Sequence, residues 1–378
     1  MDKIKQLSVA EILRKNSKGA SVGDSLDRLF QKTPTGQISS AIGNTFYGIN
    51  HRQQPGAIQI NKDYYGYTFF TRPRLNLTSE NLRAVRQMTP LLSTNKSSIQ
   101  RIIRCLLDPE LLATGIEANF VDNQQAFIPV LSNNLLSMSG WPDVVAPFST
   151  SQEGMYKEAF SLVDGLTQNY GTYDITANFR NIPGDPITLL FLSWIHYTSL
   201  VMQGLLMPYS DMVVNNEVDY NTRIYRLVMD QSKTRVQKIA ACGAAFPTSA
   251  PIGAAFNFEA DRPINAANDQ ISIHFQCMGA LYQDDILIYE FNKTVALHND
   301  SMRADRFSDF APSASSSLPP THRTYQKIPM EALGVFNNRG YPRINPLTYN
   351  LEWWVSKEDF ATNLPLYNEF KALKENNG

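Results

Sequence analysis

The groups in this sequence that could carry out chemistry are a pair of adjacent aspartates and five histidines. Asp284 and Asp285 could bind a metal ion or share acid–base work, because both tasks use carboxylates that lie close together. Adjacent residues of a strand point to opposite faces, however, and a Tyr-Gln-Asp-Asp turn is typical of solvated aspartates. The histidines show no spacing typical of metal ligands, since they occupy positions 51, 196, 274, 298 and 322.

Short catalytic motifs are also missing. The sequence has no Walker loop, no Gly-x-Gly-x-x-Gly after a strand and no His-Glu-x-x-His. Cys105, Cys242 and Cys277 lie far apart without a Cys-x-x-Cys, and their odd number fits a reducing compartment. We therefore predict that the protein is not an enzyme, that it has no catalytic or metal-binding residue, and that it binds no cofactor.

The overall charge favours neither nucleic acid nor membrane. The 378 residues carry 34 Lys and Arg against 35 Asp and Glu, a formal net charge of −1. The first fifteen residues are charged throughout and lack the apolar segment of a signal peptide, so we expect no secretion. Residues 186–210 contain no charge and are long enough to span a bilayer. Several polar side chains interrupt them, and we favour a helix buried in protein.

One cluster of charge lies in two helices predicted within residues 78–107. Glu80 is the only acidic residue in this range. Such a basic surface could contact phosphate or an acidic partner, although a charge run is more typical of a solvated outer face. Its residues are Arg83, Arg86, Lys96, Arg101 and Arg104.

The elements that would position these groups are mostly strands. Residues 64–77 are predicted to form an aromatic strand and residues 126–133 a short apolar one. In 173–180, Tyr-Asp-Ile-Thr-Ala-Asn-Phe-Arg, apolar or small side chains alternate with polar ones, which predicts a half-buried strand. Asp185 is then predicted to cap a helix that begins at Pro186.

Further strands are predicted in the second half of the chain, over residues 222–230, 235–246 and 271–282. Residues 238–258, Lys-Ile-Ala-Ala-Cys-Gly-Ala-Ala-Phe-Pro-Thr-Ser-Ala-Pro-Ile-Gly-Ala-Ala-Phe-Asn-Phe, carry a single charge. Pro and Gly interrupt them too often for a helix, and they are too apolar for an ordinary loop. We predict a strand, a Pro-containing loop and a second short strand over Gly-Ala-Ala-Phe-Asn-Phe.

These elements predict a mainly β protein with added helices, an α+β fold. Residues 1–60 read as an N-terminal arm with little apolar content of its own. Residues 61–298 form the β domain, with a helical insertion at 78–125. Residues 299–378 form a C-terminal extension or small domain that follows a Ser- and Pro-rich linker.

The order of segments resembles the tail tube proteins of contractile-tailed bacteriophages. The similarity rests on Thr-Arg-Pro-Arg-Leu-Asn-Leu, then Ile-Pro-Val-Leu-Ser-Asn, then the strand and helix of 173–197. It ends with the stretch 236–258 and the strand Ile-Ser-Ile-His-Phe-Gln-Cys-Met-Gly-Ala-Leu-Tyr. The resemblance covers residues 61–295 apart from the insertion. It is one of pattern, without a signature motif.

The resemblance implies an antiparallel β-barrel or sandwich flanked by a helix, six copies of which form a ring. Stacked rings would make a conduit through which DNA passes without sequence-specific binding. The protein would be a virion component, assembled in the host cytoplasm, that contacts neighbouring tail tube, sheath or baseplate proteins but no membrane. It could be a tube subunit or a protein of the tube–baseplate junction, because this chain is larger than most bulk tube subunits.

The resemblance also suggests residues for two surfaces. The small and aromatic residues of 238–258 would contact a neighbouring subunit: Ala240, Ala244, Phe246, Pro247, Ala254, Phe256 and Phe258. A channel for DNA should present acidic or neutral side chains inward, because each phosphate neutralised by Lys or Arg adds affinity. The acidic candidates for the lumen are Glu217, Asp219, Glu259, Asp261, Asp284 and Asp285, and the basic helices would then face outward.

Two other classes of protein stay open. A carbohydrate-binding or carbohydrate-degrading β-sandwich would use an aromatic platform and a carboxylate pair, for which Trp353-Trp354 and Asp284-Asp285 are candidates. A membrane-embedded assembly protein would rest on the apolar stretch at 186–210.

Overall fold

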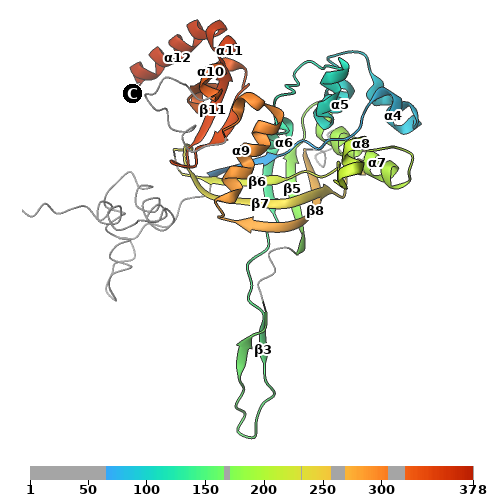
Figure 1. The fold of residues 1–378 in the computed structure, drawn as a ribbon, viewed down its shortest axis with the longest axis vertical. Coiled ribbons are helices and arrows are strands. Elements are labelled where there is room, and N and C mark those ends of the chain that lie inside the picture. The colour runs from blue at the N-terminus through green and yellow to red at the C-terminus, as the bar shows by residue number, and fades with distance from the viewer. Residues whose placement is uncertain (1–64, 166–170, 231, 257–268, 305–319, 378) are drawn as a thin grey trace, which may run out of the picture. The chain divides into compact units, whose positions relative to one another are not determined.

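The computed structural model describes residues 65–165, 171–230, 232–256, 269–304 and 320–377 (Figure 1). The predicted N-terminal arm, Phe258, Glu259 and Asp261 lie outside these residues. The main feature is a six-stranded antiparallel sheet of order β1-β6-β7-β8-β5-β2. Its strands are β1 (Tyr65–Phe70), β2 (Leu135–Ser139), β5 (Thr172–Arg180), β6 (Ile224–Met229), β7 (Val236–Pro247) and β8 (Gln270–Tyr282). The α+β prediction is confirmed.

The sheet curls strongly. Neighbouring strands lie about 4.8 Å apart, so β8 and β5, three and four strands from β1, would be far from it in a flat sheet. Yet the Phe70 ring of β1 lies 5.9 Å from Phe275 of β8 and 5.8 Å from Phe179 of β5. No strand pairing between β1 and β2 closes the sheet within the described residues. We call the face that carries Phe70 the inner face and the opposite one the outer face.

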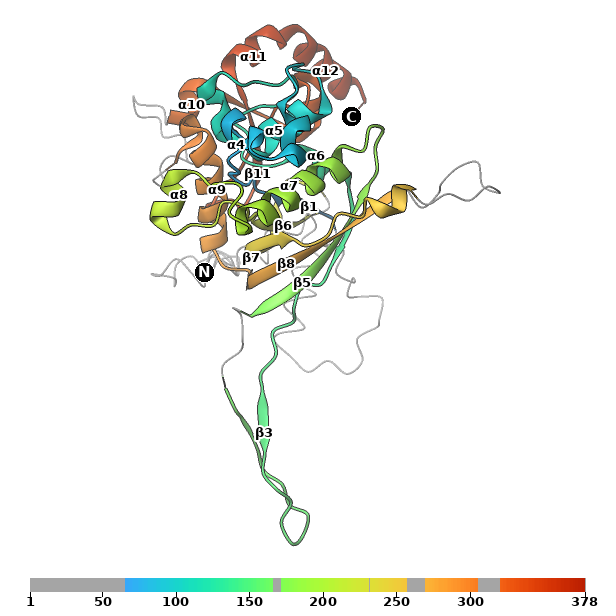
Figure 2. The same cartoon turned by 90° about the vertical axis from the view of Figure 1, so that its right-hand side faces the viewer.

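Helix α7 (Pro186–Met202) covers the inner face (Figure 2). Phe191 packs on Phe275 at 5.6 Å and stacks on Trp194, and all three are fully buried. The helix begins at Pro186, as predicted. The predicted Asp185 cap is wrong: the Asp185 side chain makes no capping bond but accepts one from Asn181, and its backbone is left-handed, with φ of 47°.

The helical insertion packs on the same core. It contains α4 (Ser79–Arg83), η1 (Arg86–Leu92), α5 (Ile99–Leu107) and η2 (Pro109–Thr114). Ser98 caps α5 by accepting from the Arg101 backbone N–H. The predicted strand at 126–133 is wrong in its second half, because Pro129 begins the helix α6 (Pro129–Asn134). Its first half pairs with the end of β1: Ile128 donates to the Phe70 carbonyl.

A second core covers part of the outer face. Phe69 of β1 packs there against Phe291 of α9 (Ile286–His298), at 5.3 Å. A three-stranded sheet of order β10-β11-β9 adds Tyr341 and Trp354 to the same core. Its strands are β9 (Tyr325–Ile328), β10 (Tyr341–Ile344) and β11 (Leu351–Ser356). The remaining elements are α8 (Ser210–Asn215), η3 (Gly253–Phe256), η5 (Asp300–Met302), α10 (Pro320–Thr324), η7 (Met330–Phe336), α11 (Lys357–Thr362) and α12 (Leu364–Asn377).

A long hairpin extends away from the sheet in both views (Figures 1 and 2). Its strands are β3 (Phe148–Thr150) and β4 (Ser161–Val163), and every residue from 143 to 165 is exposed. The short strand predicted over Gly-Ala-Ala-Phe-Asn-Phe is wrong where the structure describes it, since Gly253–Phe256 is a 3₁₀ turn.

Candidate functional site

The outer face of the main sheet is covered over β1, β6 and the start of β7, and is open over β8, β5 and β2. In β5 the odd-numbered residues Ile175, Ala177 and Phe179 are buried on the inner face, so the even-numbered ones point outward. The alternation continues in β8, where Ile273 and Phe275 are buried and His274 and Gln276 are exposed.

Strand register places these outward side chains in rows. Ser139 of β2, Thr176 of β5 and His274 of β8 are direct neighbours across three strands. The Thr176 hydroxyl lies 3.0 Å from His274 Nδ1, and the neighbouring row is joined where Asn178 donates to Ser137 at 2.8 Å. We call this surface the open polar face: Ser137, Ser139, Thr172, Asp174, Thr176, Asn178, Arg180, Gln270, Ser272, His274, Gln276 and Met278.

The open polar face is nearly uncharged. It carries one carboxylate, Asp174, and one guanidinium, Arg180. Hydroxyls and amides hydrogen-bond well to water. Without clustered cations, the face has only a weak electrostatic attraction for a polyanion. Among the described residues, no three His, Cys, Asp or Glu side chains are grouped as metal ligands.

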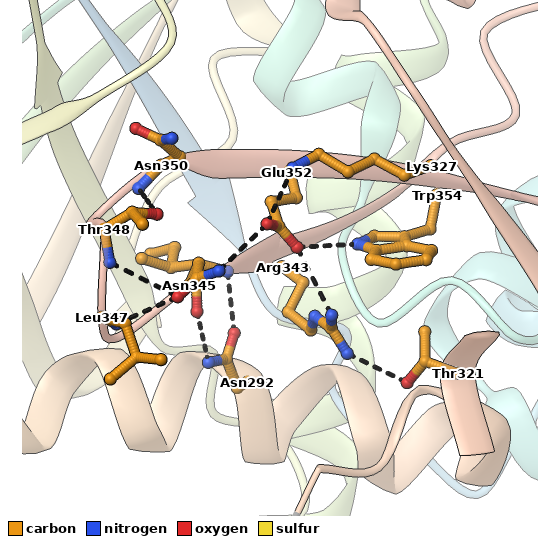
Figure 3. Close-up of polar contacts among 11 residues, drawn as sticks. Asn292, Thr321, Lys327, Arg343, Asn345, Leu347, Thr348, Asn350, Glu352 and Trp354 are labelled. Carbon is orange, nitrogen blue, oxygen red and sulfur yellow. Dashed lines mark hydrogen bonds and ion pairs between the residues drawn. The ribbon is translucent and has the colours of Figure 1, made fainter. Parts of the chain in front are cut away.

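A buried polar network stabilises the second sheet (Figure 3). Glu352 accepts from Lys327 at 2.9 Å, Asn345 at 3.2 Å, Trp354 Nε1 at 3.2 Å and Arg343 at 3.3 Å. Burial alone raises the pKa of Glu352, but the bonds and charge of Lys327 and the other donors outweigh it and hold the pKa below its usual value. Because both carboxylate oxygens are occupied by donors, we assign this cluster a structural role.

Two other carboxylates are buried beside tyrosines. Asp108 accepts from the hydroxyl of Tyr209, and Asp219 accepts from that of Tyr197 at 2.5 Å. Burial raises the pKa of Asp108 to about 6, although its hydrogen bonds favour the charged form, and burial likewise raises the pKa of Asp219. Through these hydrogen bonds both acids stabilise the packing around the α7–α8 region, so we assign them structural roles too.

Comparison with protein families decides the class. Residues 8–370 match the model of the family described as "Putative phage tail tube protein". The chain belongs to this family. Membership confirms the resemblance seen in the segment order, and it gives the chain a structural role in a phage tail.

Solved structures of tail-like assemblies are also similar. One is the tube-terminating cap of the anti-feeding prophage, with 17% identity and a TM-score of 0.26, covering 42% of this chain and 82% of that one. Another is the sheath/tube terminator of the extracellular contractile injection system PVC, with 14% identity and a TM-score of 0.24, covering 42% and 88%. No match was found among curated proteins.

The predicted subunit-contact residues of this tail tube family member lie mostly on β7. β7 is an interior strand, bonded to β6 and to β8, so its backbone is not free to pair with a strand of another copy. Ala240 pairs with Arg226 and Tyr282, and Ala244 pairs with Met278 of the open polar face. Phe246 packs on Tyr220, and Pro247 is half-buried beside it. Phe256 is exposed in η3, which also contains Ala254.

Four of the predicted lumen acids lie within the described residues, on two segments of the chain. Asp219 is a wrong assignment, because it is 3% exposed and bonded to Tyr197. Glu217 is exposed after α8, whereas Asp284 and Asp285 precede α9. Asp284 accepts from the Ile286 N–H, and Asp285 accepts from the Tyr349 hydroxyl. The polar residues that alternate in 173–180 belong to a different surface, the open polar face.

The basic residues of the insertion separate into exposed and buried ones. Arg83, Arg86 and Lys96 are exposed, while Arg101 is half-buried and donates to the Glu117 carbonyl. Arg104 is a wrong assignment, because it is 1% exposed and donates to the Leu77 carbonyl. A basic residue on the inward side of an amphipathic helix can be buried when backbone carbonyls accept its hydrogen bonds.

The features behind the two other classes also have structural roles. Trp354 is buried and Trp353 packs beside Phe69, so the pair forms no exposed aromatic platform. Helix α7 has 17 residues, and within the described residues no helix is long and apolar enough to cross a membrane.

Proposed function

We propose that six copies of this chain form a ring of the tail tube, or of the tube–baseplate junction, with the open polar face turned toward the channel. The observation that carries this proposal is the contrast between the two ends of the outer face. One end is sealed by α9 and the second sheet, and the other is a broad, ordered, nearly uncharged surface.

An uncharged lining suits a conduit for DNA. Each Lys or Arg that neutralises a phosphate releases counterions and adds affinity, which would slow a moving duplex. The open polar face offers Asp174 beside Gln276 and only Arg180 as a cation. Neutral polar side chains therefore replace the acidic lumen that the sequence suggested. The exposed basic residues Arg83, Arg86 and Lys96 lie outside the ring, where sheath or baseplate proteins meet them.

Electron microscopy of the purified chain tests the ring, and one substitution tests its orientation. Gln276→Arg should leave tubes that retain DNA in a nuclease-resistant, salt-sensitive form, whereas unmodified tubes retain little. The matched control is Gln87→Arg, at an exposed position of η1 in the insertion, which packs on the inner-face core. Nuclease-resistant DNA with Gln87→Arg but not with Gln276→Arg would reverse the orientation. Rings without a central channel would contradict the proposed role as a conduit.

Copy number per virion separates the two positions in the tail. Hundreds of copies indicate the tube, and six or a small multiple indicates the junction.

A further inference from the structure

One side chain of the open polar face can change its charge near neutral pH. The face carries Asp174 and Arg180, whose formal charges cancel, and one histidine, His274. Imidazole is the side chain that ordinarily gains or loses its proton between pH 5 and 8. His274 is exposed, so water and a ligand can both reach its ring. The net charge of the face therefore depends on one residue in each copy.

The backbone of His274 is fixed on both sides of β8. On one side, His274 pairs with Thr176 of β5. On the other side, its carbonyl accepts from the Thr248 N–H at 2.9 Å and from the Thr248 hydroxyl at 3.0 Å. Its own N–H donates to the Ser249 hydroxyl at 3.4 Å. The imidazole ring is therefore attached to a well-anchored point in the middle of the face.

The Thr176 hydroxyl can hold the ring in both of its charge states. It lies 3.0 Å from His274 Nδ1. A hydroxyl both donates and accepts hydrogen bonds, so it donates to an Nδ1 without a proton and accepts from an Nδ1 that carries one. This bond uses Nδ1 and leaves Nε2 for water or for a phosphate oxygen. Protonation therefore changes the charge of the ring without moving it.

Few charged groups surround His274. On β5, Asp174 lies one outward row away, roughly 7 Å along the strand, and Arg180 lies two rows away, roughly 14 Å. The distance to Arg180 exceeds the screening length of about 8 Å at physiological salt. Strand β2 and residues 248–250, which flank these strands, carry no charged side chain. Protonation of His274 thus changes the formal charge of the face from zero to positive.

We propose that His274 makes the grip of the channel on DNA depend on pH. The inference deepens the proposed function and rests on it, because it requires the open polar face to line the channel. At neutral pH the lining has no net charge, and the duplex moves freely. At acid pH each copy adds one imidazolium group to the lining. Each of these cations can neutralise a phosphate and release its counterions, so the lining retains DNA until the pH rises.

DNA retention at two pH values tests the proposal. Wild-type assemblies should protect duplex DNA from nuclease at about pH 5.5 but little at about pH 7.5. His274→Gln should protect little at either pH, and His274→Lys should protect at both. Protection by wild type at acid pH should weaken with salt, with a slope of roughly 0.9 for each His274 that neutralises a phosphate. The matched control is His196→Gln, which removes a histidine of α7 on the inner side of the sheet and should keep the wild-type behaviour.

The outcomes distinguish this pH dependence from the conduit itself. Equal protection by wild type and His274→Gln at acid pH would overturn the role of His274 and leave the conduit intact. The same holds if wild type fails to protect at acid pH while Gln276→Arg protects at neutral pH. DNA that binds only when His274 is present, yet stays open to nuclease, would support the change of charge and overturn the inward orientation. No protection by any variant, His274→Lys and Gln276→Arg included, would overturn both proposals.

Discussion

Tyr209 donates its hydroxyl to Asp108, lying 3.0 and 2.9 Å from the two carboxylate oxygens. The Leu77 and Glu110 N–H groups donate to the same carboxylate, and the side chain is fully buried. A charge is thus held in the packing between the insertion and the segment that leads into α8. Its energetic effect depends on pH.

We expect Asp108 to make folding more favourable as the pH falls toward 4. Its pKa is about 6 in the folded state against 3.8 as the reference, so the folded state binds the proton more tightly. Its destabilising effect is fully present above pH 6, and diminishes as the pH falls from 6 to 4. The stability difference between Asp108→Asn and the wild type should shift by about 1 kcal/mol between pH 7 and pH 5.

Denaturant unfolding at both pH values measures this shift. Comparison with the variant cancels the contributions of the other carboxylates to the pH dependence of stability. One of these is Glu352, whose lowered pKa acts in the opposite direction. An equal difference at the two pH values would contradict the prediction.

Asp185 should respond to substitution through its backbone. Because its φ is 47°, Asp185→Ala should cost about 1 kcal/mol, and Asp185→Gly or Asp185→Asn should cost less. If Asp185 acted as a helix cap, Asp185→Ser would retain most of the stability instead. Thermal melts of the four variants rank the two explanations.

Arg72, which follows β1 and bonds to the insertion, should be among the residues most sensitive to substitution. It is buried and donates to the carbonyls of Leu106, Cys105 and Gln125, among others. Arg72→Ala leaves these acceptors unpaired and should cost about 3 kcal/mol or more. Arg72→Lys should be intermediate, because one ammonium cannot reach carbonyls on both sides.

Thiol labelling can locate the Arg72 effect. Cys105 lies in the insertion, whereas Cys242 and Cys277 lie in the main sheet. In Arg72→Ala the Cys105 thiol should become reactive before the other two. Simultaneous reaction of all three would show that the insertion does not open by itself.

Ala244→Glu tests the contact predicted for residues 238–258. Ala244 is half-buried opposite Met278, so a carboxylate there can remain solvated in the monomer. If the side chain contacts another copy, the variant should stay folded and soluble but fail to assemble. Gln276→Glu is the control, because it adds the same charge to a neighbouring exposed position. Equal assembly by both variants would remove Ala244 from the interface.

The sequence by itself determined those elements whose information is local. The period-two pattern of 173–180 defined β5 and its buried face, and Pro186 defined the start of α7, because side-chain alternation and proline geometry act within a few residues. Segment order also identified the tail tube family. Local patterns were misleading where a side chain has more than one available hydrogen-bond partner. The pattern predicted that Asp185 caps α7, but its side chain accepts from Asn181 and not from the first turn of the helix.

Only the tertiary structure decided which strand lies inside the sheet and which polar residues stay in water. The small residues of β7 suggested a subunit contact, but both sides of its backbone are paired within the sheet, with β6 and with β8. Arg104 and Asp219 read as surface charges, yet their partners Leu77 and Tyr197 are 27 and 22 residues away. The open polar face likewise exists only because α9 and the second sheet stop short of β5. The burial of such single charged residues depends on contacts with other segments of the packed chain, which the local pattern does not record.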